Sequence, residues 1–125
     1  MVPLVAVVDD DLSVRESLES LIRSVGLDVR LSASAEEFLN SPQSRKADCL
    51  VFDVRLPGMS GIDLHRHLMA QRSEVGVIFM TAHGFDNRAK SEAASDWTVA
   101  CLTKPFSEDE FLSAVAAALK LRQSA

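Results

Sequence analysis

The fold of this chain is decided by the stretch Asp48-Cys49-Leu50-Val51-Phe52-Asp53-Val54-Arg55-Leu56-Pro57-Gly58-Met59-Ser60-Gly61. It begins with a short apolar run, residues 49–52, which stops at the carboxylate of Asp53. Pro57, Gly58 and Gly61 follow, and these residue types are typical of turns. An apolar run of this length between turn residues predicts a fully buried strand. We therefore expect Asp53 at the carboxyl end of a central strand, where open α/β sheets bind their ligands.

Length and composition limit the class of protein. The chain has 125 residues, of which 47% are hydrophobic and 25% are charged, as is usual for one globular domain. We expect a single domain over residues 1–125, with its core over about 4–121 and a tail or the start of a linker over 122–125. No apolar run approaches the roughly 20 residues that cross a bilayer, and the first residues lack the basic start of a signal peptide. We therefore expect a cytoplasmic protein without membrane contact.

Charge, cysteines and histidines exclude further classes. The formal net charge of −5 argues against direct nucleic-acid binding by this domain alone. Cys49 and Cys101 lie in apolar, strand-like runs, which predicts buried reduced thiols rather than a disulfide or a metal pair. His65 and His67 lack ligand spacing with other donors, so we expect neither to bind a metal.

Short apolar runs alternate with helical patterns along the whole chain. Asp11 is a candidate N-cap, and the pairs Ser34/Glu37 and Ser107/Glu110 have the spacing of capping boxes. Strands are expected at residues 4–8, 27–31, 49–53, 75–80 and 98–102, and helices at 12–25, 34–40, 61–71, 86–95 and 107–121. Helical spacing of the apolar residues places Val25 and Met69 on the inner faces of the first and third helices. This alternation predicts a three-layer, doubly wound α/β fold with a five-stranded parallel sheet. Right-handed crossovers favour the flavodoxin-like strand order 2-1-3-4-5.

Four of the five expected strands end in polar side chains. They are Asp9 and Asp10 after the first strand, Asp53 after the third, Thr81 after the fourth and Lys104 after the fifth. Because parallel strands end at one edge of a sheet, these groups should converge. Carboxylates this close repel one another unless a cation joins them, and a small set of oxygen ligands suits Mg²⁺. The sequence therefore predicts a Mg²⁺ site at that edge.

Four short segments carry a family resemblance. They are Val-Val-Asp9-Asp10, Phe-Asp53-Val-Arg-Leu-Pro57-Gly58-Met-Ser-Gly61, Met-Thr81-Ala82 and Thr-Lys104-Pro105-Phe106. In this order and spacing they resemble the bacterial two-component response-regulator receiver domain of the CheY-like family, over about residues 4–121. The residues around Asp53 and the run Thr-Ala-His-Gly at 81–84 are similar to the corresponding segments in receivers whose regulators carry a C-terminal LuxR-type helix-turn-helix.

The resemblance implies a role for each matched residue. Asp53 would be the phosphoacceptor that attacks the phosphohistidine of a sensor histidine kinase. Asp10, Asp53 and the backbone carbonyl of Arg55 would bind Mg²⁺ directly, and Asp9 would assist through a water. Lys104 would pair with a phosphoryl oxygen, and the Thr81 hydroxyl would donate to another.

Further residues of the matched segments would modulate the switch. Ala82 follows the threonine, and the Lys104-Pro105 bond is expected to be cis, which X–Pro bonds permit at low cost. Arg55 and His83 lie two positions after Asp53 and Thr81, where receivers tune the lifetime of the acyl phosphate. The alternative is that both are solvated rim residues.

The chain departs from the family before Lys104. The position three residues earlier, usually Tyr or Phe, is Cys101, and Trp97 stands where small residues are usual. The segment between Thr81 and Lys104 is also about one residue longer than in similar receivers. Three hypotheses remain open: Trp97 takes over part of the aromatic role, the output surface works differently, or Trp97 simply packs against the helix expected at 86–95.

The resemblance implies a signalling switch rather than an enzyme with an external substrate. On phosphorylation the surface of the fourth helix, fifth strand and fifth helix would change and control an output such as transcription. Expected partners are the kinase, a second copy in a phosphorylation-dependent homodimer, and a C-terminal DNA-binding domain outside these residues. The alternatives are a phosphorylation-independent interaction module and an aspartate-nucleophile phosphatase, although Arg55 stands where such phosphatases have a second Asp.

Overall fold

One parallel sheet of five strands forms the centre of the computed structural model, which describes residues 2–124. Its strands are β1 (Leu4–Val8), β2 (Asp28–Ser32), β3 (Cys49–Asp53), β4 (Gly76–Thr81) and β5 (Thr98–Thr103). The order is β2-β1-β3-β4-β5, and all neighbouring strands are parallel. The strand order and the parallel sheet expected from the sequence are thus confirmed, including the more polar β2 at one edge.

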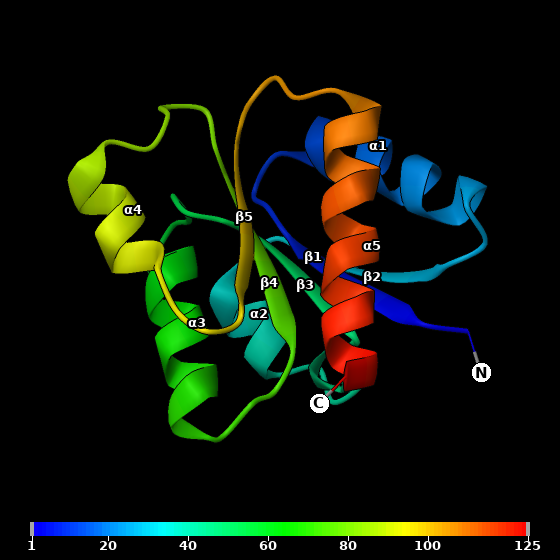
Figure 1. Cartoon of the computed structure of the whole chain (residues 1–125), viewed down its shortest axis with the longest axis horizontal. Coiled ribbons are helices and arrows are strands. Elements are labelled where there is room, and N and C mark those ends of the chain that lie inside the picture. The colour runs from blue at the N-terminus through cyan, green and yellow to red at the C-terminus, as the bar shows by residue number, and fades with distance from the viewer. Residues whose placement is uncertain (1, 125) are drawn as a thin grey trace.

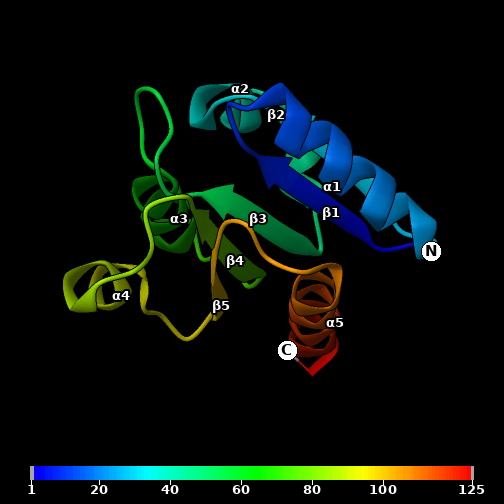
Figure 2. The same ribbon diagram turned by 90° about the horizontal axis from the view of Figure 1, so that it is seen from above.

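Four α-helices connect the strands, and a fifth follows the last strand. They are α1 (Leu12–Ser24), α2 (Ala35–Leu39), α3 (Gly61–Ala70), α4 (Asn87–Ala93) and α5 (Glu108–Ser124), and a short 3-10 helix, η1 (Ser44–Lys46), lies in the segment expected to be a loop. Seen from above, α1 and α5 cover one face of the sheet, and α2, α3 and α4 lie on the other (Figures 1 and 2). Within residues 2–124, no helix combines the length and the apolar character needed to cross a bilayer.

Two apolar cores fill the spaces between the layers. The core under α1 and α5 includes Ile22 and Phe111, which pack on strand residues such as Val7. The core under α2 and α3 includes Phe38 and Leu64 on the opposite face of the same strands. The three central strands β1, β3 and β4 are covered on both sides, which explains why their sequences read as continuous apolar runs rather than as alternating patterns.

Helix starts follow the capping signals in the sequence. Asp11 accepts hydrogen bonds from the amides of Ser13 and Val14 at the start of α1. At α5 the capping box is complete, because Ser107 Oγ accepts from the Glu110 amide at 3.0 Å and Glu110 Oε1 accepts from the Ser107 amide at 3.1 Å. These bonds satisfy amides that the helix leaves without partners. They begin α1 and α5 directly beyond the carboxyl ends of β1 and β5.

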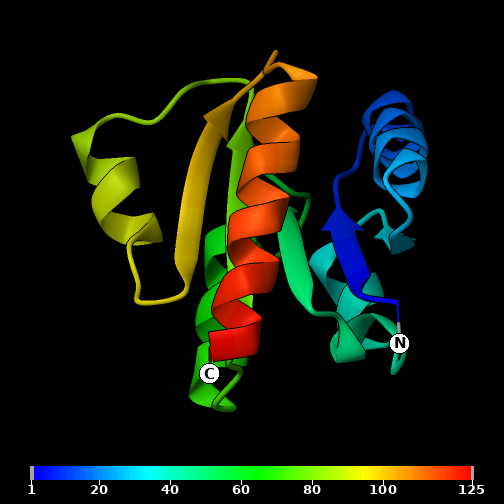
Figure 3. The same ribbon diagram turned by 45° about the vertical axis from the view of Figure 1, so that its right-hand side comes forward.

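The α4–β5 region is the most irregular part of the fold. The helix α4 has seven residues, and Ala93 is its one fully buried residue. The pairing of β4 with β5 shifts in register, because Val77 pairs with Thr98 while Ile78 pairs with Ala100. Val99 is the extra residue at this shift. Figure 3 shows α4 standing apart from the compact layers at the end of a long connection from β4.

Some side chains expected to face the core are exposed. Met69, placed on the inner face of α3 by its spacing, is 37% exposed, and Val25 at the end of α1 is 49% exposed. Both lie near the end of their helix, where the chain turns away from the sheet. Cys49 is buried as expected, whereas Cys101 on the edge strand β5 is only half-buried, and both are free thiols.

His65 on α3 is buried against the sheet. Its side chain packs edge-on against Phe79 of β4, with ring centroids 5.6 Å apart, and the residue is 3% exposed. Burial lowers the pKa of His65 from 6.5 to about 4, because the apolar surroundings disfavour the charged imidazolium. The structure therefore places this histidine in the core, where the neutral ring acts as an apolar side chain.

We expect His65 to make the fold less stable in acid. The unfolded chain takes up the proton near pH 6.5 and the folded chain only near pH 4, so stability is lost as the pH falls between these values. The loss should approach about 3 kcal/mol, since each pKa unit corresponds to about 1.4 kcal/mol. Urea unfolding at several pH values should show a flatter profile for His65→Phe than for the wild type.

The matched control is His67→Phe, which removes an exposed histidine from the same helix. Its pH profile should follow the wild type. Parallel profiles for His65→Phe and the wild type between pH 6.5 and 4 would contradict this interpretation.

Candidate functional site

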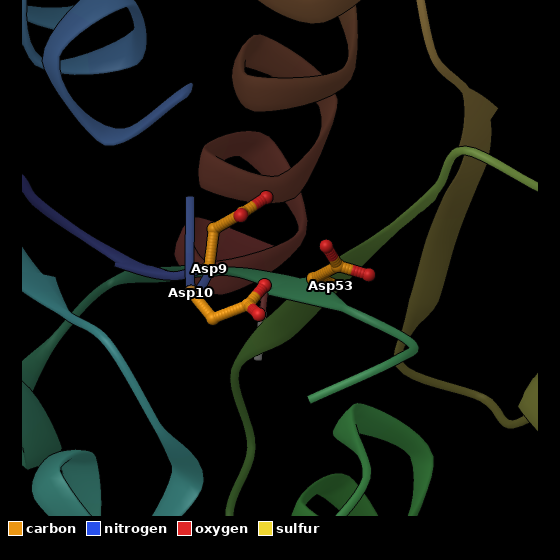
Figure 4. A group of neighbouring side chains, drawn as sticks. All are labelled: Asp9, Asp10 and Asp53. Carbon is orange, nitrogen blue, oxygen red and sulfur yellow. The ribbon is translucent and has the colours of Figure 1, made fainter. Parts of the chain in front are cut away.

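Three aspartates meet at the carboxyl edge of the sheet. Asp9 and Asp10 follow β1, and Asp53 ends the neighbouring strand β3 (Figure 4). One carboxylate oxygen from each lies within 4.8 Å of the others. They converge because β1 and β3 are paired in parallel, with Val8 opposite Phe52, so that both strands end at the same level.

Lys104 joins this cluster from the end of β5. Its Nζ donates to Asp9 Oδ2 at 2.6 Å and to Asp53 Oδ2 at 2.9 Å. The Asp9 side chain is fully buried and that of Lys104 is 18% exposed, so these ion pairs are largely shielded from water. The ammonium group therefore balances part of the negative charge that three neighbouring carboxylates create.

The pKa shifts of this pair reflect burial and mutual contact. Burial raises the pKa of Asp9, and the nearby Asp53 charge adds to this, while the hydrogen bonds from Lys104 and the Asp11 amide oppose it. Burial alone would lower the pKa of Lys104, but its hydrogen bonds to Asp9 and Asp53 outweigh that effect and raise it. Lys104 is therefore positively charged at neutral pH. Its hydrogen bond to Asp9 favours the ionised form of that buried carboxylate.

Asp53 is held in place by its own loop. Its Oδ1 accepts a hydrogen bond from the Arg55 amide at 3.0 Å, while Oδ2 faces Lys104. Behind it, Gly61 approaches the backbone so closely that a Cβ there would lie 2.1 Å from the Asp53 carbonyl oxygen. The residue at position 61 must therefore lack a side chain if α3 is to begin against the end of β3.

Thr81 completes the group from the end of β4. The residue is 2% exposed, and its Oγ1 accepts a hydrogen bond from the His83 amide at 3.1 Å. Its backbone carbonyl accepts from the Lys104 amide at 2.8 Å, which ties the ends of β4 and β5 together. The hydroxyl proton stays available for a further acceptor, because the His83 bond uses only an oxygen lone pair.

The acidic cluster fits a hard divalent cation. Its ligands are carboxylate oxygens only, which suit Mg²⁺ better than they suit softer metals. Asp10 is exposed, so solvent can reach the cluster from that side. Asp9 and Asp53 each accept hydrogen bonds from Lys104 and from a backbone amide, but the Asp9 side chain is fully buried, whereas Asp53 keeps some exposure, so Asp10 and Asp53 are better placed to supply direct ligands.

The predicted modulating residues fall into two groups. Arg55, Ala82, His83 and Pro105 are exposed around the site, and the Lys104-Pro105 bond is cis, as expected. Cys101 of β5 packs against the apolar core under α2 and α3, and it pairs with Phe79 of β4 in the sheet.

Trp97 lies at the other end of β5 from Lys104. It precedes the strand, and four residues of extended chain, about 13 Å, separate it from Cys101. The structure therefore does not bring Trp97 to the position of the usual aromatic residue. Its packing against α4 stays a prediction.

The structure adds two residues that the sequence did not reveal. Arg15 of α1 donates from Nη1 to the Asp9 carbonyl oxygen at 2.8 Å, and Glu36 of α2 accepts from the Met59 amide at 3.2 Å. Each holds one of the loops that carry the site. Neither lies in a recognisable motif, because the contacts depend on how helices pack beside the loops.

Comparison with known proteins places the chain in a family. It matches the response regulator receiver domain family over residues 5–116 and belongs to that family. It is 42% identical over 118 residues to response regulator protein TodT of Pseudomonas putida, covering 94% of this chain and 52% of TodT. It is 42% identical over 115 residues to transcriptional regulatory protein FixJ of Azorhizobium caulinodans, covering 92% of this chain and 54% of FixJ.

A solved structure supports the same conclusion. The response regulator StyR superimposes with a TM-score of 0.84 at 40% identity, over 99% of this chain and 62% of StyR. The chain thus spans about half the length of the curated relatives it matches, and among those relatives are transcriptional regulators. The chain is a receiver domain of the two-component response regulators, with the CheY-like fold.

We expect Lys104→Met to destabilise the fold. The change leaves the buried Asp9 carboxylate without its cation, and breaking a buried ion pair costs about 3 kcal/mol. Urea unfolding at neutral pH with EDTA should show this loss. Lys46→Met, which removes an exposed lysine, is the control and should unfold like the wild type. Equal stability of Lys104→Met and Lys46→Met would show that the ammonium is not needed.

We expect Gly61→Ala to be far more harmful than Gly26→Ala. The new methyl group at position 61 would overlap the Asp53 carbonyl, which forces α3 and β3 apart at a cost of about 3 kcal/mol. Gly26 has a positive φ, +82°, but nothing lies within 4 Å of a Cβ there, so its cost should be about 1 kcal/mol. Chemical denaturation of both variants measures the difference, and equal losses would contradict the packing argument.

Proposed function

We propose that this domain accepts a phosphoryl group on Asp53 from the phosphohistidine of a sensor histidine kinase. The observation that carries the proposal is the placement of the Asp53 carboxylate beside the Lys104 ammonium, at 2.9 Å, and within the acidic cluster. Receiver domains are phosphorylated by histidine kinases, which gives the donor class for this chain. On this proposal the domain catalyses only its own phosphotransfer and dephosphorylation and has no external substrate.

Asp53 is arranged as a nucleophile. One carboxylate oxygen attacks phosphorus, the bond between phosphorus and the kinase imidazole nitrogen breaks, and the imidazole leaves with that electron pair. The Arg55 amide and Lys104 each hold one oxygen of Asp53, so the carboxylate has a defined orientation before the donor arrives. Such prior orientation removes part of the entropic cost of the reaction.

Lys104 and Thr81 are placed to receive the transferred group. Lys104 can shift from the Asp53 carboxylate to a phosphoryl oxygen, where its charge opposes the added negative charge. The Thr81 hydroxyl can donate to a second phosphoryl oxygen, since its proton is available. A move of Thr81 would act on the segment that leads to α4, because the His83 amide is bound to its hydroxyl.

Asp10, Asp53 and the Arg55 carbonyl would hold Mg²⁺ directly, and Asp9 would act through a water. A bound Mg²⁺ would neutralise charge on the transferring group and template in-line attack. The acidic cluster supports this proposal, because the single ammonium of Lys104 leaves it with excess negative charge.

The output is proposed to be control of transcription. Two curated relatives, each about twice the length of this chain, are regulators, and FixJ is named as transcriptional. We infer that a C-terminal DNA-binding domain follows in the full protein and that the α4–β5–α5 surface transmits the signal, through a phosphorylation-dependent homodimer. Within this surface α4 is held least firmly, because it has seven residues and buries only Ala93.

Incubation with acetyl phosphate and Mg²⁺, followed by intact mass measurement, tests the proposal. The wild type should gain the mass of one phosphoryl group, and Asp53→Asn should gain none because the amide is not a nucleophile. Asp63→Asn, which changes an exposed carboxylate on α3, is the control and should be phosphorylated like the wild type. A folded wild type that gains no mass would favour the phosphorylation-independent interaction module.

A further inference from the structure

Arg15 contacts the backbone directly before Asp10 through its side chain. Its guanidinium Nη1 donates to the Asp9 carbonyl oxygen at 2.8 Å, and its backbone amide donates to the Asp11 carbonyl oxygen at 3.1 Å. The first bond is charge-assisted and half-buried, which makes it stronger than a neutral surface bond. The second bond is the first backbone bond of the helix, so the Arg15 side chain itself holds only the peptide group between Asp9 and Asp10.

Asp9 itself is held at every polar group. Its amide donates to the Ser32 carbonyl of β2 at 3.1 Å, which extends the sheet by one bond. Its carboxylate accepts from the Asp11 amide at 2.9 Å and from Lys104. The Asp9 backbone carbonyl accepts from Arg15, so the plane of the peptide group between Asp9 and Asp10 is fixed.

The Asp10 carboxylate is different, because nothing holds it directly. It is exposed, and within residues 2–124 no donor binds its oxygens. Figure 4 shows it directed toward Asp53, across the space that the three carboxylates enclose. The direction of this side chain therefore depends on the backbone that precedes it, which the Arg15 guanidinium holds at the Asp9 carbonyl.

We propose that Arg15 is a positioning residue for Mg²⁺ binding. By fixing the peptide group between Asp9 and Asp10, its guanidinium aims the Asp10 carboxylate into the cluster and raises the affinity for the ion. The inference rests on the proposed function, because it assigns Asp10 the role of a direct metal ligand. Residues that orient metal ligands commonly affect metal affinity by about tenfold or more.

The direction in which the Mg²⁺ affinity changes when Arg15 is removed distinguishes a positioning role from a purely electrostatic one. The Arg15 guanidinium is a positive charge near the site, and it repels a divalent cation. If charge alone mattered, removing Arg15 would strengthen Mg²⁺ binding. If the arginine orients Asp10, its removal weakens binding despite the loss of repulsion.

Isothermal titration of Mg²⁺ into metal-free wild type, Arg15→Met and Arg23→Met tests the inference. Arg23 lies on the same helix and makes only an exposed ion pair with Glu19 at 3.6 Å, so Arg23→Met removes the same charge without touching the acidic loop. We expect Arg15→Met to raise the dissociation constant about tenfold and Arg23→Met to leave it within about twofold. Urea unfolding with EDTA checks that each variant is folded.

Two outcomes overturn the inference. An unchanged or lower dissociation constant for folded Arg15→Met, with or without a loss of stability, limits Arg15 to a structural role and leaves the proposed function standing. A wild type that binds no Mg²⁺ overturns both. If Arg15→Met does not fold, Arg15→Lys takes its place, since it keeps the charge but not the planar guanidinium. Weaker binding by this variant supports positioning, and an unchanged dissociation constant overturns it.

Discussion

The arrangement of the site depends on the contact of the Lys104 ammonium group with the carboxylates of Asp9 and Asp53. Lys104 follows the edge strand β5, yet its Nζ bonds Asp9 and Asp53 at the ends of β1 and β3. Three carboxylates within 4.8 Å would otherwise repel one another and strain the edge of the sheet. The same contact leaves the cluster partly neutralised, so that it tolerates its charge in the resting state and still attracts a further cation.

The surrounding elements support this contact from outside. Arg15 and Glu36 hold the loops after β1 and β3, and Gly61 allows α3 to begin against the Asp53 carbonyl. These residues touch the backbone rather than the reacting groups. The site is therefore rigid on the β1 and β3 side, whereas the β4–α4–β5 side has a short helix and a register shift. The proposed phosphorylation would need such an arrangement, with one part of the site fixed and another able to move.

Sequence reasoning succeeded wherever the pattern was local or repeated. Continuous apolar runs identified the buried strands, and capping residues such as Asp11 and Ser107 identified helix starts. It was less accurate where packing decides, as at Met69, whose helical spacing suggested burial although the residue is 37% exposed. Trp97 was considered for the place of the usual aromatic residue, but it lies at the opposite end of β5 from Lys104.

By itself the sequence determined the strand order, the five polar residues at the carboxyl edge and the family resemblance. It could do so because parallel strands bring their ends together whatever the details of packing. The tertiary structure alone decided that Lys104 pairs with Asp9 as well as with Asp53, that Arg15 holds the Asp9 carbonyl, and that His65 is buried against Phe79. These contacts join side chains to partners on other elements, and only the distances set by helix and sheet packing select among the partners that the sequence allows.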